Sequence, residues 1–152
     1  MKDLIPQLRS AVGAANVLTE GDLSAYEMDW RRRSRGKALA VVRPGSTGEV
    51  AAVVRACAAA GTPIVPQGGN TGMVVGSTPD DSGRAVVLNL TRMNRVRAID
   101  AGNLTITLDA GCVLQNVQDA AQARTTAATS PVEPGRTTAS ALPRERLRQS
   151  IS

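Results

Sequence analysis

The sequence predicts an α+β fold in which a strand-helix-strand unit is followed by a further antiparallel-type sheet. Three observations carry this prediction: a continuous apolar run at 38–42, a helical repeat of apolar residues directly after it, and later segments in which apolar and polar residues alternate. The length of 152 residues is enough for one domain with a buried core. Because Phe is absent and there is one Trp, that core must be built from small aliphatic side chains.

The first element expected is a short amphipathic helix. Apolar residues recur at helical spacing from Leu4 to Val12, and Gly13 follows as a stop signal. The pattern therefore predicts a helix over 4–12. The segment 29–37 then carries four arginines and a lysine. We interpret it as an exposed connector, and a solvated basic loop is favoured over a dedicated anion site.

The strand-helix-strand unit has the clearest signals. The apolar run 38–42 ends before Pro44, as in a strand that is buried on both faces. Ser46 and Glu49 have the spacing of a capping box, and apolar residues then follow at helical spacing until Gly61. A second short strand is predicted at 62–66, which completes the unit.

The second half of the chain is predicted to contain a hairpin and a helix. The segment 100–103 has the composition of a hairpin-type turn, and apolar residues after Gly111 resume helical spacing. Further strands are expected at 85–90, 96–99 and 104–108.

A glycine-rich turn at 67–72 follows the predicted strand-helix-strand unit directly. Its three glycines would let the main chain wrap an anion, both by unusual dihedral angles and by close approach. The side chains of Asn70 and Thr71 would add polar contacts to phosphate oxygens. No Gly-Lys-Ser/Thr follows and 73–75 reads as extended, so neither a P-loop nor a dinucleotide Rossmann turn is present. From the turn alone, a plain surface loop is favoured over a phosphate-binding turn.

Composition limits the classes of function. The formal net charge is +5, but the last 29 residues hold five arginines against two Asp or Glu, and one Trp and one Tyr offer little for bases to stack on. No nucleic-acid partner and no membrane span are expected. His is absent, which removes the commonest general base and metal ligand. We assign no catalytic residue and no metal ligand.

The two cysteines, Cys57 and Cys112, are isolated in the sequence. No secretory leader is recognised, so free thiols in a reducing compartment are expected, and the cytoplasm is the predicted location. Cys57 lies on the apolar stripe of the predicted helix, which favours a buried structural thiol.

Three ordered blocks of sequence, 42–50, 63–74 and 108–114, resemble the FAD-linked oxidase family. The domain type is that of p-cresol methylhydroxylase and vanillyl-alcohol oxidase. The sequence Pro-Gln-Gly-Gly-Asn-Thr-Gly at 66–72 is most similar to that of D-2-hydroxyglutarate and D-lactate dehydrogenases. The resemblance covers roughly residues 27–123.

The resemblance implies the N-terminal part of a p-cresol methylhydroxylase-type FAD-binding domain, with the glycine-rich turn around the FAD pyrophosphate. Attachment of FAD would be non-covalent, since the His that some relatives use is absent. Val75 departs from the pattern, because relatives commonly have Gly there and a β-branched residue resists positive φ. The residues implied to bind the cofactor are Pro66, Gln67, Gly68, Gly69, Asn70, Thr71, Gly72, Met73 and Gly76.

By the same resemblance, the full-length relative would oxidise a small-molecule 2-hydroxy acid, with the flavin taking a hydride equivalent. We expect little or no activity from this chain alone, because the family's substrate domain is not visible in it. A non-catalytic truncated remnant or interaction module is the alternative.

Three regions are expected along the chain: 1–37 as N-terminal helix and basic connector, 38–123 as partial FAD-binding domain, and 124–152 as a disordered or frameshifted tail. The tail is rich in Arg, Thr, Ala, Ser and Pro and has no apolar periodicity. Back-translated and read one nucleotide out of phase, 129–136 can yield Pro-Leu-Pro-Leu-Ser-Leu-Ala-Ala, similar to the family's continuation. A frameshift is favoured over a natural tail.

Overall fold

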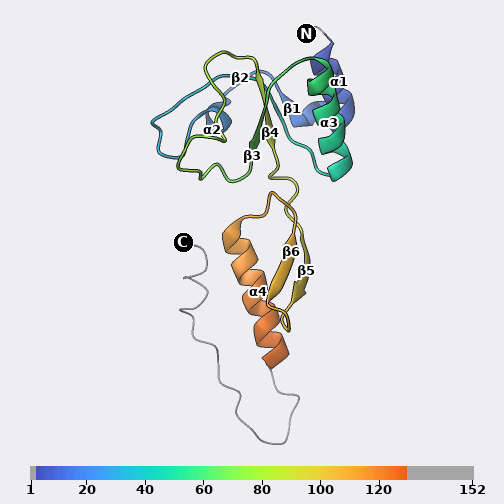
Figure 1. The fold of residues 1–152 in the computed structure, drawn as a ribbon, viewed down its shortest axis with the longest axis vertical. Coiled ribbons are helices and arrows are strands. Elements are labelled where there is room, and N and C mark those ends of the chain that lie inside the picture. Colours follow the sequence, from blue (N-terminus) through green and yellow to red (C-terminus); the bar gives the residue numbers. More distant parts are fainter. Residues whose placement is uncertain (1–2, 130–152) are drawn as a thin grey trace, which may run out of the picture.

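The computed structural model describes residues 3–129, which form a four-stranded sheet with helices and a two-stranded sheet with one long helix (Figure 1). The elements in chain order are α1 (Leu4–Val12), η1 (Ala14–Asn16), β1 (Val17–Leu18), α2 (Ser24–Glu27), β2 (Ala38–Val42), α3 (Thr47–Ala59), β3 (Ile64–Gln67), β4 (Ala85–Asn89), β5 (Val96–Asp100), β6 (Thr105–Leu108) and α4 (Leu114–Thr129). Within these described residues, no helix is long and apolar enough to cross a membrane.

The larger sheet has the strand order β1-β2-β4-β3. β2 and β3 both pair with β4 in parallel, and Val87 is the register partner of Val41 on one side and of Val65 on the other. The predicted strand-helix-strand unit is confirmed as β2-α3-β3, although β4 lies between its two strands. The three parallel strands therefore end at one edge of the sheet, where ligands bind in open α/β sheets.

The core lies on both faces of this sheet. α1 and α3 cover one face, where Leu8, Val53 and Cys57 are fully buried, as the sequence predicts for Cys57. Val41 and Val87 are buried on the opposite face, against side chains that include Tyr26. Burying each Val or Leu side chain contributes roughly 1.5–3 kcal/mol. β4 is buried at all five positions, as its continuous apolar run requires.

The start of α3 shows how the sequence sets a helix boundary. The Ser46 side chain accepts a hydrogen bond from Glu49 N at 3.2 Å, as predicted for the cap. The Glu49 carboxylate accepts from Gly45 N at 2.8 Å, one residue earlier than a standard capping box. Val54, which fits the apolar spacing, is 42% exposed and lies off the buried stripe.

The smaller sheet is the antiparallel hairpin β5-β6, and the turn at 100–103 is confirmed as its connection. Asp100 stabilises that turn, because its carboxylate accepts from Asn103 N at 3.0 Å and from Asn103 Nδ2 at 2.7 Å. α4 follows and continues to Thr129, past the predicted start of the tail at 124. The remainder of the predicted tail and of the candidate frameshift segment lies outside the described residues.

Gly111 is where the chain passes closely between the two sheets. Its N–H donates to Met93 O at 2.8 Å, and a Cβ at this position would overlap the carbonyl oxygen of Leu90. A glycine is therefore required here by close approach of two backbones. This contact fixes the segment before α4 against the loop that follows β4.

Candidate functional site

The glycine loop, defined as residues 68–76, begins at the carboxyl end of β3. Ala110 lies beside its first residue, since a Cβ on Gly68 would be 3.8 Å from Ala110 O. The turn after β2 reaches the same edge of the sheet, because Arg92 Nη1 donates to Arg43 O at 2.6 Å. The three sequence blocks therefore meet where the parallel strands end.

The glycines of this loop are not required by the fold. None of Gly68, Gly69, Gly72 or Gly76 has φ between +20° and +160°. A Cβ on Gly69 would come no closer than 4.0 Å to another heavy atom, and Gly72 and Gly76 have nothing within 4 Å. A Cβ would therefore fit at each of these positions, and the space beside the glycines is open.

The unusual dihedral angles occur at other residues of the loop. Asn70 has φ +53° and Val75 has φ +63°. The expectation that the glycines supply these dihedrals was wrong, although their close-approach role is consistent with the open space beside them. Asn tolerates this region, whereas for a β-branched residue it is an outlier that stores strain.

The main chain of the loop offers a row of free donors. Among the described residues, no acceptor is hydrogen-bonded to the backbone N–H groups of 68–72. Consecutive unpaired N–H groups beside residues without Cβ are the chemistry that binds phosphate oxygens. The loop therefore fits a diphosphate on two independent counts, free donors and open space.

Gln67 holds the two ends of the loop together. Its side chain is buried, and Nε2 donates to Tyr26 O at 2.9 Å and to Ser77 O at 2.8 Å. Its Oε1 accepts from Asn89 Nδ2 at 3.2 Å. The structure thus places the Gln67 side chain inside the protein, where it supports the loop.

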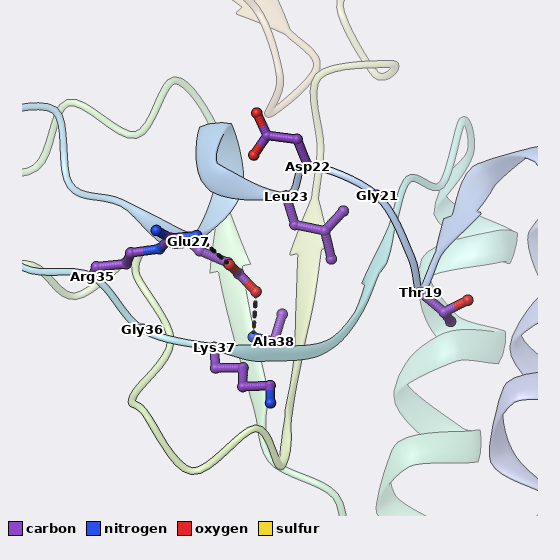
Figure 2. A pocket seen from close by; sticks show the side chains of 9 residues that line it. All are labelled: Thr19, Gly21, Asp22, Leu23, Glu27, Arg35, Gly36, Lys37 and Ala38. Carbon is purple, nitrogen blue, oxygen red and sulfur yellow. Dashed lines mark hydrogen bonds and ion pairs between the residues drawn. The ribbon is translucent and has the colours of Figure 1, made fainter.

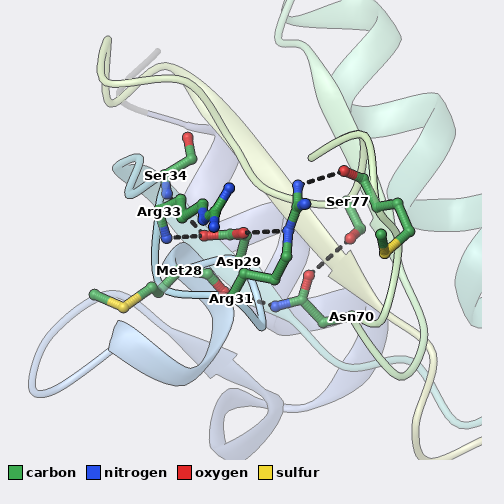
Figure 3. A network of polar contacts seen from close by, with 8 residues as sticks. Met28, Asp29, Arg31, Arg33, Ser34, Asn70 and Ser77 are labelled. Carbon is green, nitrogen blue, oxygen red and sulfur yellow. Dashed lines mark hydrogen bonds and ion pairs between the residues drawn. The ribbon is translucent and has the colours of Figure 1, made fainter.

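Asn70 is anchored in a similar way. Its Nδ2 donates to Met28 O at 2.7 Å, and its Oδ1 accepts from the Ser77 hydroxyl at 2.7 Å (Figure 3). From the sequence, this side chain is expected to contact phosphate oxygens. One amide hydrogen and one acceptor lone pair remain for such a contact.

The other predicted site residues lie on the surface. Pro66 is exposed and precedes the last residue of β3, and the side chain of Met73 is 61% exposed. Thr71 and Gly76 are also exposed. The structure brings all nine predicted site residues together in one loop and its approach strand, and their contact with a cofactor stays a prediction.

Two site residues were missed by sequence reasoning. Arg31 Nη2 donates to Met73 O at 2.7 Å, and Arg31 Nε lies 3.9 Å from the carboxylate of Asp29 (Figure 3). Asp29 is buried, and its Oδ1 accepts from Arg33 N and Ser34 N, both at 2.7 Å. The hydrogen bond from Ser34 N is the main cause that holds the pKa of Asp29 below its ordinary value.

The basic segment is thus divided. Its other cations, Arg32, Arg33, Arg35 and Lys37, are exposed as predicted. Arg31 instead packs against the glycine loop, with 29% of its side chain exposed. No periodicity could have found this contact. The one available signal was Asp29 itself, whose type and position favour hydrogen bonds to the backbone just after it.

Asp109 fixes the neighbouring segment. Its buried carboxylate accepts from Arg95 Nε at 3.3 Å and from Arg97 Nε at 2.5 Å. Burial raises the pKa of this carboxyl, but the hydrogen bonds from Arg97 and Arg95 outweigh it and the net pKa is lowered. The ionised Asp109 carboxylate therefore holds Arg97 of β5 against the end of β6. The next residue, Ala110, lies beside Gly68 at the start of the glycine loop.

Two hollows of the surface lie away from the glycine loop. A cavity of about 440 Å³ is formed between α2 and β2, where Glu27 Oε1 accepts from Ala38 N at 2.9 Å (Figure 2). A second, of about 460 Å³, lies between α1 and α3. Neither is lined by a predicted site residue. Neither hollow therefore belongs to the predicted cofactor site.

Comparison with known protein families matches residues 38–143 to the family described as FAD binding domain. D-2-hydroxyglutarate dehydrogenase of Xanthomonas citri pv. viticola is 40% identical over 119 residues, which are 78% of this chain and 25% of that protein. The mitochondrial D-2-hydroxyglutarate dehydrogenase of Bos taurus is 34% identical over 116 residues, 75% of this chain and 21% of that protein. The chain spans about a quarter or less of the length of these relatives.

Among solved structures, p-cresol methylhydroxylase with substrate bound superposes with a TM-score of 0.66 at 21% identity, over 82% of this chain and 25% of that one. This likeness shows the fold: a mixed α+β arrangement of the p-cresol methylhydroxylase type, in which the sheets are not closed. The fold predicted from the sequence is confirmed.

Proposed function

Because this chain belongs to the FAD binding domain family, we propose that it is the part of a flavin-dependent dehydrogenase that holds the FAD diphosphate. FAD is the cofactor of this family. The whole protein would oxidise a small 2-hydroxy acid of the D-2-hydroxyglutarate or D-lactate type. The names of the two relatives support the D-2-hydroxyglutarate type. The amino-acid sequence at 66–72 supports both the D-2-hydroxyglutarate and the D-lactate type.

One observation carries the proposal. The glycine loop combines free backbone N–H groups at 68–72 with glycines that neither φ nor packing requires. A surface loop without a ligand gains nothing from such glycines and loses conformational entropy by having them. An anion that must approach the main chain closely explains both features together.

The residues of the chain have distinct tasks in this proposal. The main chain of 68–72 donates to diphosphate oxygens, and Gly76 leaves room at the far end. Pro66 and Gln67 set the start of the loop, while Met73 is held through its carbonyl oxygen. Bound FAD supplies the acceptor for a hydride equivalent from the substrate's alcohol carbon. The binding is non-covalent in our proposal, in keeping with the absence of His.

No residue of this chain is assigned to substrate or to proton transfer. The proposal therefore gives this chain alone cofactor binding and little or no turnover. We also propose the same division of the chain into three regions, 1–37, 38–123 and 124–152. Tyr26 and Met28 of the first region nevertheless support the glycine loop of the second. The cytoplasmic location also stays a prediction, and the bovine relative is named as mitochondrial.

A second candidate function is a non-catalytic remnant or interaction module. β3 is at the edge of the larger sheet, and β5 and β6 form a sheet of two strands. Edge strands with unpaired backbone groups favour pairing with another chain or aggregation. A purified protein that is yellow and releases flavin on denaturation supports the cofactor-holding function. A colourless, poorly soluble product supports the remnant.

A titration tests the proposed function directly. Trp30 is the one tryptophan of the chain and adjoins Arg31, so its fluorescence reports a flavin bound at the glycine loop. We expect saturable quenching by FAD. Displacement by ADP, which carries the diphosphate, with none by adenosine, would place the binding energy on the diphosphate. Absence of saturable quenching contradicts the proposal.

A further inference from the structure

The segment 26–31 holds the glycine loop and the residue before it at three positions, 67, 70 and 73, which are three residues apart. Gln67 Nε2 donates to Tyr26 O, and Asn70 Nδ2 donates to Met28 O. The third contact runs the other way, from the Arg31 guanidinium to Met73 O at 2.7 Å. The first two fix the start and the middle of the loop, and Arg31 alone of the three reaches the part beyond the free amides.

Arg31 is itself fixed by a buried partner. The side chain of Asp29 is 2% exposed, and its Oδ2 lies 3.9 Å from Arg31 Nε. Both atoms are shielded from solvent and have no hydrogen-bond partner in the described part of the chain. A buried carboxylate is stabilised by a facing cation, so Asp29 favours the side-chain conformation in which Arg31 lies over the loop. The backbone donors Arg33 and Ser34 fix Asp29 in turn.

Arg31 also keeps spare donors. A guanidinium has five N–H donors and is always ionised. In the described part of the chain its one hydrogen bond is to Met73 O. A positive charge thus lies against a loop whose amides are free, while the neighbouring Arg32 and Arg33 are exposed.

We propose that Arg31, held by Asp29, is a positioning residue that fixes the second half of the glycine loop, at Met73, in its diphosphate-holding shape before the cofactor binds. This inference rests on the proposed function for its consequence, because an ordered loop binds FAD without the entropic cost of ordering it. The inference assigns Asp29 and Arg31 a role in cofactor binding, although the sequence identifies their segment only as basic.

The test is Arg31→Met, with Arg33→Met as the matched control. Both remove one positive charge from the same segment, and the Arg33 side chain is exposed and makes no hydrogen bond or ion pair within the described residues. In each protein the backbone 15N–1H heteronuclear NOE of 71–76 is measured without FAD, followed by the FAD affinity from Trp30 quenching. Arg31→Lys keeps the charge but has three donors in place of five. Asp29→Asn keeps the shape of the partner without its charge.

We expect Arg31→Met to lower the heteronuclear NOE of 71–76 towards values of a flexible segment, with α3 unchanged, and to weaken FAD binding by about tenfold or more. Arg33→Met should leave the NOE unchanged, with a smaller loss of affinity from charge alone. Arg31→Lys should recover part of the affinity and Asp29→Asn should lose part of it.

Equal NOE values for 71–76 in the Arg31 and Arg33 variants would overturn the positioning role. So would a uniform loss of order in α3 and the loop together, since that marks a general structural role. Failure of every protein, the unchanged chain included, to bind FAD would overturn the proposed function instead. The NOE difference without cofactor then still decides whether Arg31 orders the loop.

Discussion

The Ser77 hydroxyl donates a 2.7 Å hydrogen bond to Asn70 Oδ1, and this closes the end of the glycine loop onto its middle. Asn70 passes the constraint on, because its Nδ2 donates to Met28 O. The loop is therefore shaped by side-chain hydrogen bonds, while its own amides stay free for a ligand.

This pair gives the first prediction. Asn70→Ala should lower the free energy of unfolding by about 2–3 kcal/mol, because two hydrogen bonds are lost and a residue with φ +53° becomes alanine. Ser77→Ala should cost about 1 kcal/mol. Urea denaturation of both single variants and the double variant measures the coupling. Strictly additive effects would show that the two side chains do not act as a pair.

Val75→Gly should stabilise the apo-protein by up to about 1 kcal/mol, because it relieves a β-branched residue at φ +63°. The entropy that glycine adds to the unfolded chain offsets part of the gain. Val74→Gly is the control, since Val74 is adjacent and 88% exposed but is not among the residues of positive φ. Thermal denaturation decides the point. A Val75→Gly protein that melts no higher than the Val74→Gly protein would show that the strain is absent in solution.

Gly111→Ala should destabilise the fold by about 2 kcal/mol or more, because the new Cβ overlaps the Leu90 carbonyl oxygen. Gly36→Ala should have a similar effect, since its Cβ overlaps the carbonyl oxygen of Pro79. Circular dichroism during urea denaturation measures both. Variants as stable as the original chain would mean that these backbones do not approach as closely as described.

Acid should destabilise the protein through Asp109. Its folded pKa is lowered, so its stabilisation is complete above the ordinary Asp pKa of about 3.9 and is lost as the pH falls through the lower folded pKa. Melting temperatures between pH 2 and 6 should therefore fall less steeply in Asp109→Asn than in the original chain. Asp81→Asn, at an exposed position, is the control. Equal slopes in the two variants would show that Asp109 does not contribute to the acid destabilisation.

Much of the fold follows from local sequence signals. The helix at 4–12 and the strand at 38–42 have the predicted bounds, because periodicity and stop signals coincide there. The strand predicted at 62–66 is shifted to Ile64–Gln67. β1 and α2 were not predicted, since two and four residues are too few for a periodic signal.

Other features depend on tertiary contacts that no local pattern records. The insertion of β4 between β2 and β3 is a choice of strand order, which periodicity does not determine. The exposure of Val54, next to the fully buried Val53, depends on which face of α3 packs against the sheet. The glycine loop itself was found from its composition. The inward side chain of Gln67 and the contact of Arg31 with Met73 join segments about 40 residues apart and could not be found that way.

The most direct test of the central claim is FAD binding by Gly72→Ala, followed by Trp30 fluorescence. Gly72 has open space and an ordinary φ, so the melting temperature without FAD should stay within about 2 °C of the original chain. FAD binding should weaken by about tenfold or more, because the methyl group occupies space that the diphosphate needs. Gly102→Ala, in the hairpin turn, should leave FAD affinity unchanged. A Gly72→Ala protein with unchanged stability and unchanged FAD affinity would contradict the account.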